Sequence, residues 1–231
     1  MNPSALVFDA YGTLFDVASV AEACAAVAPE PDTLVALWRA KQLEYSFLRS
    51  LMGSSAYVDF WTITADALDF AADRLGLRLT SAERERALRG WLEVRAYPEV
   101  ESTLDILANQ GRRCLILSNG TPGMLEAALT GAGIARRFQA VLSVDEVRVF
   151  KPHPRVYQMA IDALATSPGD LLFISSNGWD AAGARASGLP VAWLNRTGAP
   201  PERLGVSPDV TLPDLSALPP LLTRTPQAEG I

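Results

Sequence analysis

Four short segments of this chain combine carboxylates, hydroxyls, amides and a lysine in a way that supports chemistry on a small anion. They are Phe8-Asp9-Ala10-Tyr11-Gly12-Thr13, Leu117-Ser118-Asn119-Gly120, Phe150-Lys151-Pro152 and Ser175-Ser176-Asn177-Gly178-Trp179-Asp180. Each lies at or near the point where a short apolar run of a predicted sheet ends. Because ligands bind beyond the carboxyl ends of strands in open α/β sheets, we expect these segments to converge on one site around Asp9.

Each of these residues taken singly also fits an ordinary structural role. Asp9 fits a turn cap, Ser118 and Asn119 fit the start of a helix, and Lys151 fits a surface position. Asp180 fits the acidic first turn of a helix. Their joint occurrence at strand ends favours a site that holds a reactive carboxylate beside a lysine, hydroxyl and amide donors and a second carboxylate.

The hydrophobic pattern predicts the elements that position these segments. An apolar strand ends at Asp9, and from residue 97 onward helical segments alternate with apolar strands at 114–117, 141–142, 171–174 and 191–194. This alternation is typical of a doubly wound, Rossmann-like α/β fold, in which helices cover both faces of a parallel sheet. The tail after Leu222 reads as frayed.

Residues 16–96 lose strand alternation and show helical periods instead. One apolar face runs from Leu34 to Met52, a second repeats at three- and four-residue spacing from Val58 to Leu75, and a third helix begins at the capping box of Thr80 and Glu83. We therefore predict a catalytic core of residues 1–15 and 97–231 and a helical cap, residues 16–96, inserted after the first strand. The 58–75 seam packs within the cap or against a second subunit.

Composition narrows the class of protein. The 231 residues are 49% hydrophobic with a net charge of −6, which predicts a globular protein and argues against nucleic acid as a partner. Apolar stretches are too short to span a membrane, and a cytoplasmic location with Cys24 and Cys114 as buried, reduced thiols is expected. The single histidine, His153, excludes most histidine-dependent triads and fits a solvated loop.

The four segments resemble the four motifs of the haloacid dehalogenase superfamily, and within it those of the L-2-haloacid dehalogenases. The stretch 37–45 resembles the cap helix of the same family. Most superfamily members are phosphotransferases with Asp-x-Asp in the first motif and acidic residues in the fourth, which hold magnesium. Here Tyr11 replaces the second Asp, and Ser175 and Asn177 stand where acidic ligands are expected. Because a hard divalent cation needs several oxygen ligands, we expect neither a metal nor another cofactor.

The resemblance implies a hydrolase acting on carbon–halide bonds, which converts short-chain L-2-haloacids into D-2-hydroxy acids and halide. Asp9 attacks the halogenated carbon from behind, and water hydrolyses the resulting ester. Lys151 keeps Asp9 ionised and oriented. The alternatives are a magnesium-dependent phosphatase that uses Asp9 as phosphoryl acceptor, and an idle relative that binds an anion or a protein partner. The resemblance also implies a homodimer.

The resemblance implies roles for the other site residues. Ser118 binds the substrate carboxylate and Asn119 holds a developing oxyanion, while Arg39 reaches down from the cap and binds halide together with Asn177. Thr13 fixes Asp9.

Asp180, held with Ser175 and Lys151, positions or activates the hydrolytic water. Tyr157 supports the substrate or Lys151, or only packs on its own helix. An apolar wall surrounds the alkyl group and halogen and consists of Tyr11, Leu43, Phe60 and Trp179. For Leu43 and Phe60, packing inside the cap is the alternative.

Overall fold

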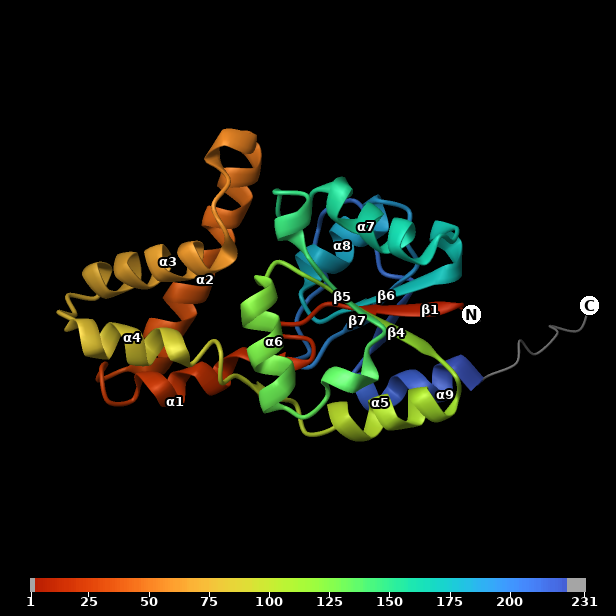
Figure 1. Cartoon of the computed structure of the whole chain (residues 1–231), viewed down its shortest axis with the longest axis horizontal. Coiled ribbons are helices and arrows are strands. Elements are labelled where there is room, and N and C mark those ends of the chain that lie inside the picture. Colours follow the sequence, from red (N-terminus) through yellow and green to blue (C-terminus); the bar gives the residue numbers. More distant parts are fainter. Residues whose placement is uncertain (1–2, 224–231) are drawn as a thin grey trace, which may run out of the picture.

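The computed structural model describes residues 3–223, and these form a six-stranded parallel sheet with helices on both sides (Figure 1). The strands lie in the order β5-β4-β1-β6-β7-β8. Their bounds are β1 Ala5–Phe8, β4 Arg113–Ser118, β5 Ala140–Ser143, β6 Leu171–Ser175, β7 Val191–Leu194 and β8 Val210–Leu212. The predicted doubly wound parallel sheet is confirmed.

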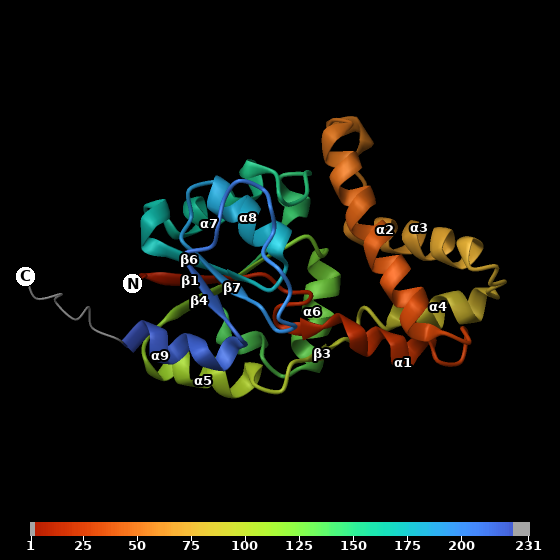
Figure 2. The ribbon, with the colours of Figure 1, turned by 180° about the vertical axis from the view of Figure 1, so that it is seen from behind.

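Helices cover the two faces of this sheet. In the two opposite views, α7 and α8 lie on one side of the sheet and α5 and α9 on the other (Figures 1 and 2). The bounds of the helices outside residues 16–96 are α5 Val100–Asn109, α6 Pro122–Gly131, α7 Pro154–Leu164, α8 Gly178–Ala186 and α9 Leu218–Thr223. Coverage on both faces explains why β1 is apolar throughout and β6 is apolar up to its last residue, Ser175, since every residue of both strands is buried.

Strand register brings the ends of β1, β4 and β6 together. Phe8 of β1 pairs with Ile116 of β4 on one side and with Ile174 of β6 on the other. The Asp9 N–H continues the ladder by donating to the Ile174 carbonyl at 2.9 Å. The residues that follow these three strands therefore leave the sheet at the same edge.

Residues 16–96, the segment predicted to form a cap and called the cap below, lie beside this edge (Figure 1). Its helices are α1 Val20–Cys24, α2 Pro31–Leu51, α3 Phe60–Arg74 and α4 Ser81–Arg89. The predicted capping box is present, since the Thr80 N–H donates to Glu83 Oε2 at 2.8 Å and the Glu83 N–H donates to Thr80 Oγ1 at 3.3 Å. α2 packs on α3, and Leu68 and Ala72 of the 58–75 seam are buried.

Several short elements were not predicted. β2 (Phe15–Asp16) pairs antiparallel with β3 (Arg95–Ala96), where the chain enters and leaves the cap. β8, α1 and α9 were also missed, because two to six residues carry no readable period. α8 begins at Gly178 rather than Asp180, and α4 ends at Arg89, before the predicted Trp91. The predicted frayed tail after Leu222 includes Thr223, which is the last residue of α9; its other residues, 224–231, lie outside the described residues.

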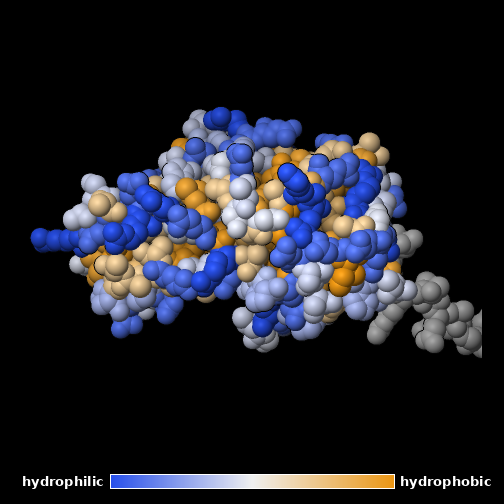
Figure 3. Space-filling view, turned by 60° about the horizontal axis from the view of Figure 1, so that its bottom comes forward, coloured by the Kyte–Doolittle hydropathy of each residue, from blue (hydrophilic) through white to orange (hydrophobic). Residues whose placement is uncertain are grey.

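Surface and chain properties agree with a globular unit. Within residues 3–223 no helix has both the length and the hydropathy needed to cross a membrane. Figure 3 shows hydrophilic and hydrophobic residues interspersed over the face that it displays. His153 is not merely solvated: it is half-buried, and its Nδ1 accepts from the Arg155 N–H at 3.2 Å and caps α7.

Candidate active site

Asp9 lies at the carboxyl end of β1, and only 6% of the residue is exposed. Its Oδ2 accepts hydrogen bonds from Thr13 Oγ1 at 2.9 Å, Asn177 Nδ2 at 2.8 Å and Ser175 Oγ at 3.4 Å. Its Oδ1 accepts from Lys151 Nζ at 3.0 Å. Four donors therefore fix the orientation of the carboxylate, and Oδ1 keeps more of its lone-pair capacity free than Oδ2.

A tight turn after β1 brings Thr13 back onto Asp9. Gly12 has a φ of +89°, which L side chains rarely adopt, and the Thr13 N–H donates to the Ala10 carbonyl at 3.1 Å. The Thr13 hydroxyl also accepts from the Ser176 N–H at 2.8 Å. Thr13 thus ties the end of β1 to the loop after β6.

Lys151 joins the two carboxylates of the site. Its buried Nζ lies 3.0 Å from Asp9 Oδ1 and 2.9 Å from Asp180 Oδ2. Burial lowers the pKa of Lys151, but the charges of Asp180 and Asp9 outweigh it and leave this pKa raised. Lys151 is therefore protonated at neutral pH and holds both carboxylates.

Asp180 is fully buried near the start of α8. Burial raises its pKa to about 6; the Asp9 charge adds to the rise, while Lys151 and a hydrogen bond from Tyr157 Oη to Oδ1, at 2.8 Å, oppose it. The Asp180 carboxyl thus takes up or gives up a proton near neutral pH.

A small cavity opens between the core and the cap. It is narrow, with about 10 Å³ of room for a water-sized sphere, which is space for about one water molecule. Its walls come from the loop after β1, the end of β4 and the loop that follows it, the loops after β5 and β6, and the helices α2, α3 and α8. They consist of Asp9, Tyr11, Arg39, Leu43, Phe60, Ser118, Asn119, Lys151, Asn177 and Trp179. All four residues predicted for the apolar wall are among them.

Arg39 reaches this cavity from α2. Its Nη1 donates to Gln42 Oε1 at 2.6 Å, and its guanidinium lies over the Trp91 ring, 5.5 Å from the centroid. Burial lowers the pKa of Arg39 to about 10, against the opposing effect of Asp9, so the side chain remains a cation. The Gln42 Nε2 in turn donates to Thr64 Oγ1 at 2.7 Å, which anchors the arrangement to α3.

Comparison with known proteins places this site in a family. The model of the haloacid dehalogenase-like hydrolases matches residues 3–188. This chain belongs to the haloacid dehalogenase-like hydrolases. The (S)-2-haloacid dehalogenase of Pseudomonas sp. (strain YL) is 44% identical over 214 residues, or 92% of this chain and 91% of that protein. Haloacetate dehalogenase H-2 of Moraxella sp. (strain B) is 39% identical over 215 residues, which are 93% of this chain and 95% of that protein.

A solved haloacid dehalogenase supports the fold. The structure of the L-2-haloacid dehalogenase from Xanthobacter autotrophicus with chloropropionic acid covalently bound is 39% identical, with a TM-score of 0.87. The match covers 96% of this chain and 98% of that one.

The residues of this site do not suit the magnesium ion that many members of the superfamily bind. Within residues 3–223, no three His, Cys, Asp or Glu side chains gather closely enough to hold a metal ion. The two site carboxylates, Asp9 and Asp180, both bind the ammonium of Lys151. A cation on the same oxygens would have to displace that charge.

Ser118 and Asn119 lie where donors to a bound anion are expected. Ser118 Oγ accepts from the Gly120 N–H at 3.1 Å, which leaves its own hydrogen free to point into the cavity. Asn119 Oδ1 accepts from the Lys151 N–H at 3.0 Å, so the amide presents its Nδ2 elsewhere.

Three predicted site residues make contacts that the sequence did not specify. Ser175 was expected to hold Asp180, but its hydroxyl donates to Asp9. Tyr157 was expected to support the substrate or Lys151, or only to pack on its own helix; it lies outside the cavity lining, and its hydroxyl bonds Asp180. Asn177 was expected at the halide with Arg39 and lines the cavity with it, while its Nδ2 donates to Asp9 Oδ2 and, at 3.0 Å, to the Tyr11 carbonyl.

The structure adds Gln42 and Trp91 to the site. Both are fully buried, and both contact the Arg39 side chain from within the cap. A signal for Gln42 was present, because it follows the buried Trp38 by four residues on the same helical face. A buried polar side chain on an apolar stripe needs a partner, and here it has two.

Proposed function

We propose that this protein hydrolyses short-chain L-2-haloacids to D-2-hydroxy acids and halide. The observation that carries the proposal is the Asp9 carboxylate in the cavity wall, with Oδ1 held by one donor and the Arg39 cation supplied by the cap. A carboxylate nucleophile beside an apolar wall and a halide-binding cation is what displacement at carbon requires. The names and structures of the relatives support the same reaction.

In the first step, an Asp9 oxygen attacks the carbon that bears the halogen, and the carbon–halogen bond breaks with its electron pair on the departing halide. Oδ1 is the nucleophile, because Oδ2 already accepts three hydrogen bonds. Back-side attack inverts the carbon. Arg39 receives the halide, since the Asn177 amide hydrogens are engaged with Asp9 and Tyr11.

The substrate carboxylate binds on the side of Ser118 and Asn119. The Ser118 hydroxyl and the Asn119 Nδ2 supply donors. Each hydrogen bond to the charged carboxylate stabilises the bound substrate by about 1.5–3 kcal/mol. Tyr11, Leu43, Phe60 and Trp179 surround the alkyl group and the halogen. Their apolar surface weakens the solvation of the leaving halide and strengthens its contact with Arg39.

In the second step, water attacks the ester carbonyl carbon of Asp9, and its proton passes to Asp180. Collapse of the oxyanion breaks the bond between that carbon and the oxygen now joined to the substrate, and this oxygen takes the proton from Asp180 and leaves as the hydroxyl of the hydroxy acid. Asp9 loses its remaining proton to solvent and is restored as a carboxylate. A pKa of about 6 leaves Asp180 largely ionised at neutral pH, as a base requires. Lys151 holds Asp180 in place and stabilises negative charge on Asp9.

The test is halide release from the separate L and D forms of 2-chloropropionate, with a chelator present and with Asp9→Asn as control. We expect release from the L form alone, unaffected by the chelator and absent in the variant. Magnesium-dependent release of phosphate from a phosphate ester, without halide release, would contradict the proposal. Binding of the haloacid without turnover in the unmodified protein would point to an idle relative.

We further infer that residues 16–96 move as a cap relative to residues 1–15 and 97–231. The β2–β3 ribbon connects the two parts, and the cavity draws its walls from both. Closure would exclude water and bring Arg39 over Asp9. A cytoplasmic location is proposed from Cys24 and Cys114, which are unpaired and buried, with burial raising their thiol pKa values to about 11 and about 12.

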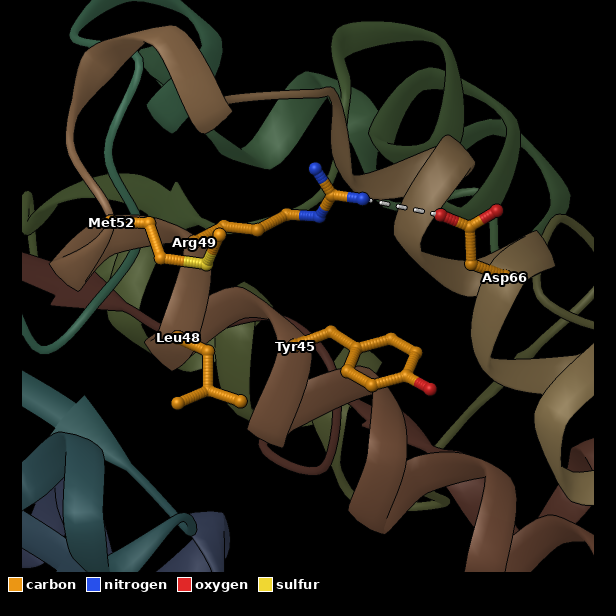
Figure 4. A pocket seen from close by; sticks show the side chains of 5 residues that line it. All are labelled: Tyr45, Leu48, Arg49, Met52 and Asp66. Atoms are coloured by element: carbon orange, nitrogen blue, oxygen red, sulfur yellow. Dashed lines mark hydrogen bonds and ion pairs between the residues drawn. The ribbon is translucent and has the colours of Figure 1, made fainter.

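A homodimer is proposed through the outer end of α2. Leu48, Leu51 and Met52 there are 45%, 83% and 70% exposed. Figure 4 shows Leu48 and Met52 beside the Arg49–Asp66 ion pair in a hollow of this surface. The 58–75 seam is the poorer choice, because much of it already packs on α2. Light scattering on Leu51→Asp tests the assembly, and an unchanged molar mass would count against this surface.

A further inference from the structure

Phe150, the residue before Lys151, is held by three residues of the cap. The Tyr57 ring stacks on it with a centroid distance of 5.1 Å and an interplanar angle of 22°. The centroid of the Phe60 ring lies 5.9 Å from that of Phe150, and the backbone N–H of Phe150 donates to Ser50 Oγ at 3.0 Å. Phe150 is fully buried by these contacts. The cap therefore grips the chain one residue before the site lysine.

Tyr57 makes further contacts with the same loop. Its hydroxyl donates to Asp145 Oδ1, and the Arg148 guanidinium lies over its ring, 4.9 Å from the centroid. Burial and the neighbouring Asp145 raise the pKa of Tyr57, so the hydroxyl stays protonated as a donor. Arg148 has a φ of +52°, a costly conformation for a residue with a side chain. Tyr57 thus touches the 145–150 segment at three points.

Lys151 is fixed from the core as well. Its backbone N–H donates to Asn119 Oδ1 at 3.0 Å, and its Nζ bonds Asp9 and Asp180. The core provides these partners in any position of the cap, whereas the contacts of Phe150 exist only with the cap in place. Tyr57 lies outside the cavity lining, so it acts on the site through this loop.

We propose that Tyr57 is a positioning residue for Lys151, which stacks on Phe150 and bonds Asp145 so that closure of the cap fixes the bridge between Asp9 and Asp180. The inference rests on the proposed function, because that reaction gives Lys151 its role. Closure then does two things at once: it brings Arg39 over the cavity, and it sets the lysine that holds both carboxylates. A substrate that lets the cap close thereby completes both halves of the site.

The experiment compares Tyr57→Leu, which removes stack and hydrogen bond, with Tyr57→Phe, which removes only the hydrogen bond. Tyr45→Leu is the control, since Tyr45 is a half-buried cap tyrosine whose ring contacts Phe70 and Lys41 of the cap rather than the core. We expect Tyr57→Leu to lower kcat for L-2-chloropropionate about tenfold at pH 6–7 and to move the acid limb of the profile to higher pH by about one unit. A looser Lys151 stabilises the ionised form of Asp180 less.

A second readout does not depend on activity. The chain has two lysines, Lys41 and Lys151, so acetylation followed by peptide mass spectrometry reports on each. Tyr57→Leu should raise the labelling of Lys151 severalfold relative to Lys41, with Tyr57→Phe between it and the unmodified protein. Tyr45→Leu should leave the labelling of Lys151 itself unchanged; for this control Lys151 is compared directly between the two proteins, because the Tyr45 ring lies 5.7 Å from Lys41 Nζ. If Tyr57→Leu does not fold, as judged by circular dichroism, Asp145→Asn replaces it with the same expected directions.

Two failures are distinguishable. An unmodified protein that releases no halide contradicts the proposed function, and the labelling ratio then still tests the position of Lys151. An active protein in which Tyr57→Leu matches Tyr45→Leu in kcat, pH profile and Lys151 labelling overturns the positioning role of Tyr57. A fall in kcat with neither a shifted acid limb nor altered labelling also overturns it, because that outcome indicates a general loss of cap packing.

Discussion

Gly183 of α8 lies close to α7, so the single methyl group added by Gly183→Ala should disturb the site. A Cβ at Gly183 would lie 2.4 Å from the Pro152 Cβ and 2.5 Å from Tyr157 Oη. Carbon atoms in contact sit about 3.5–4.0 Å apart, so these neighbours must separate by roughly 1 Å. Both are attached to the site, since Pro152 follows Lys151 and Tyr157 bonds Asp180.

The magnitude follows from the Tyr157–Asp180 hydrogen bond. Its 2.8 Å length would grow to about 3.8 Å, beyond hydrogen-bond distance. A hydrogen bond to a charged group is worth about 1.5–3 kcal/mol, which corresponds to a rise of about 1–2 units in the pKa of Asp180. The sign is upward because the bond favours the ionised carboxylate. Overpacking should also cost about 1–3 kcal/mol of unfolding free energy.

The assay is the pH profile of kcat together with urea unfolding of Gly183→Ala. The acid limb should move from near pH 6 toward higher pH, and Tyr157→Phe should show the same shift with less loss of stability. Gly123→Ala is the matched control, because Gly123 lies in α6 and a Cβ there meets no atom within 4 Å. That variant should be as active as the unmodified protein and slightly more stable.

One result would refute this reasoning. If Gly183→Ala keeps both the unmodified pH profile and an unfolding free energy like that of Gly123→Ala, then α8 and α7 separate without cost. The Tyr157 hydroxyl would then have no part in setting the pKa of Asp180.

Three further predictions concern residues of the cavity and its support. Asp180→Asn should release about one equivalent of halide and then stall as the Asp9 ester, detectable by mass spectrometry of the intact protein, and multiple turnovers would contradict the base role. Arg39→Lys should lower kcat/KM about 10–100-fold in steady-state assays, because lysine lacks the planar donor pair, and equal activity would remove Arg39 from the halide site. Thr13→Val should lower the unfolding free energy by about 1–3 kcal/mol in urea titrations, since it leaves the partly buried Ser176 N–H without its acceptor, and no change would mean that water replaces the hydroxyl.

Much of the fold was readable because its signals are local. Continuous apolar runs for β1, β4, β6 and β7 follow from burial on both faces, and the Thr80–Glu83 box marked a helix start by its own chemistry. The composition of the cavity wall was also predictable, because the motif residues sit at strand ends that meet at one edge. Elements of two to six residues, such as β8, depend on neighbours rather than on their own sequence.

The partners of individual atoms were not predictable. Whether Ser175 bonds Asp9 or Asp180 depends on side-chain positions that spacing does not fix, as does the engagement of the Asn177 amide. The grip of Tyr57 on Phe150 joins residues far apart in the chain and in different parts of the fold. Contacts of this kind become visible only when the cap is placed on the core.

The order of strands in the sheet also bears on how the chain is made. β1 is synthesised early, yet its neighbours are β4 and β6, and the nearer of these begins at Arg113, about 100 residues later. At about 5–20 residues per second, β1 waits roughly 5–20 s for its first partner to be translated. All residues of the cap helices and of the β2–β3 ribbon are translated before β4, so we expect their contacts with one another to form within that interval. We therefore expect the cap to fold first on the ribosome. The folded cap would hold together the segments that lead to β1 and to α5, while the sheet assembles around β1, the first strand to be synthesised.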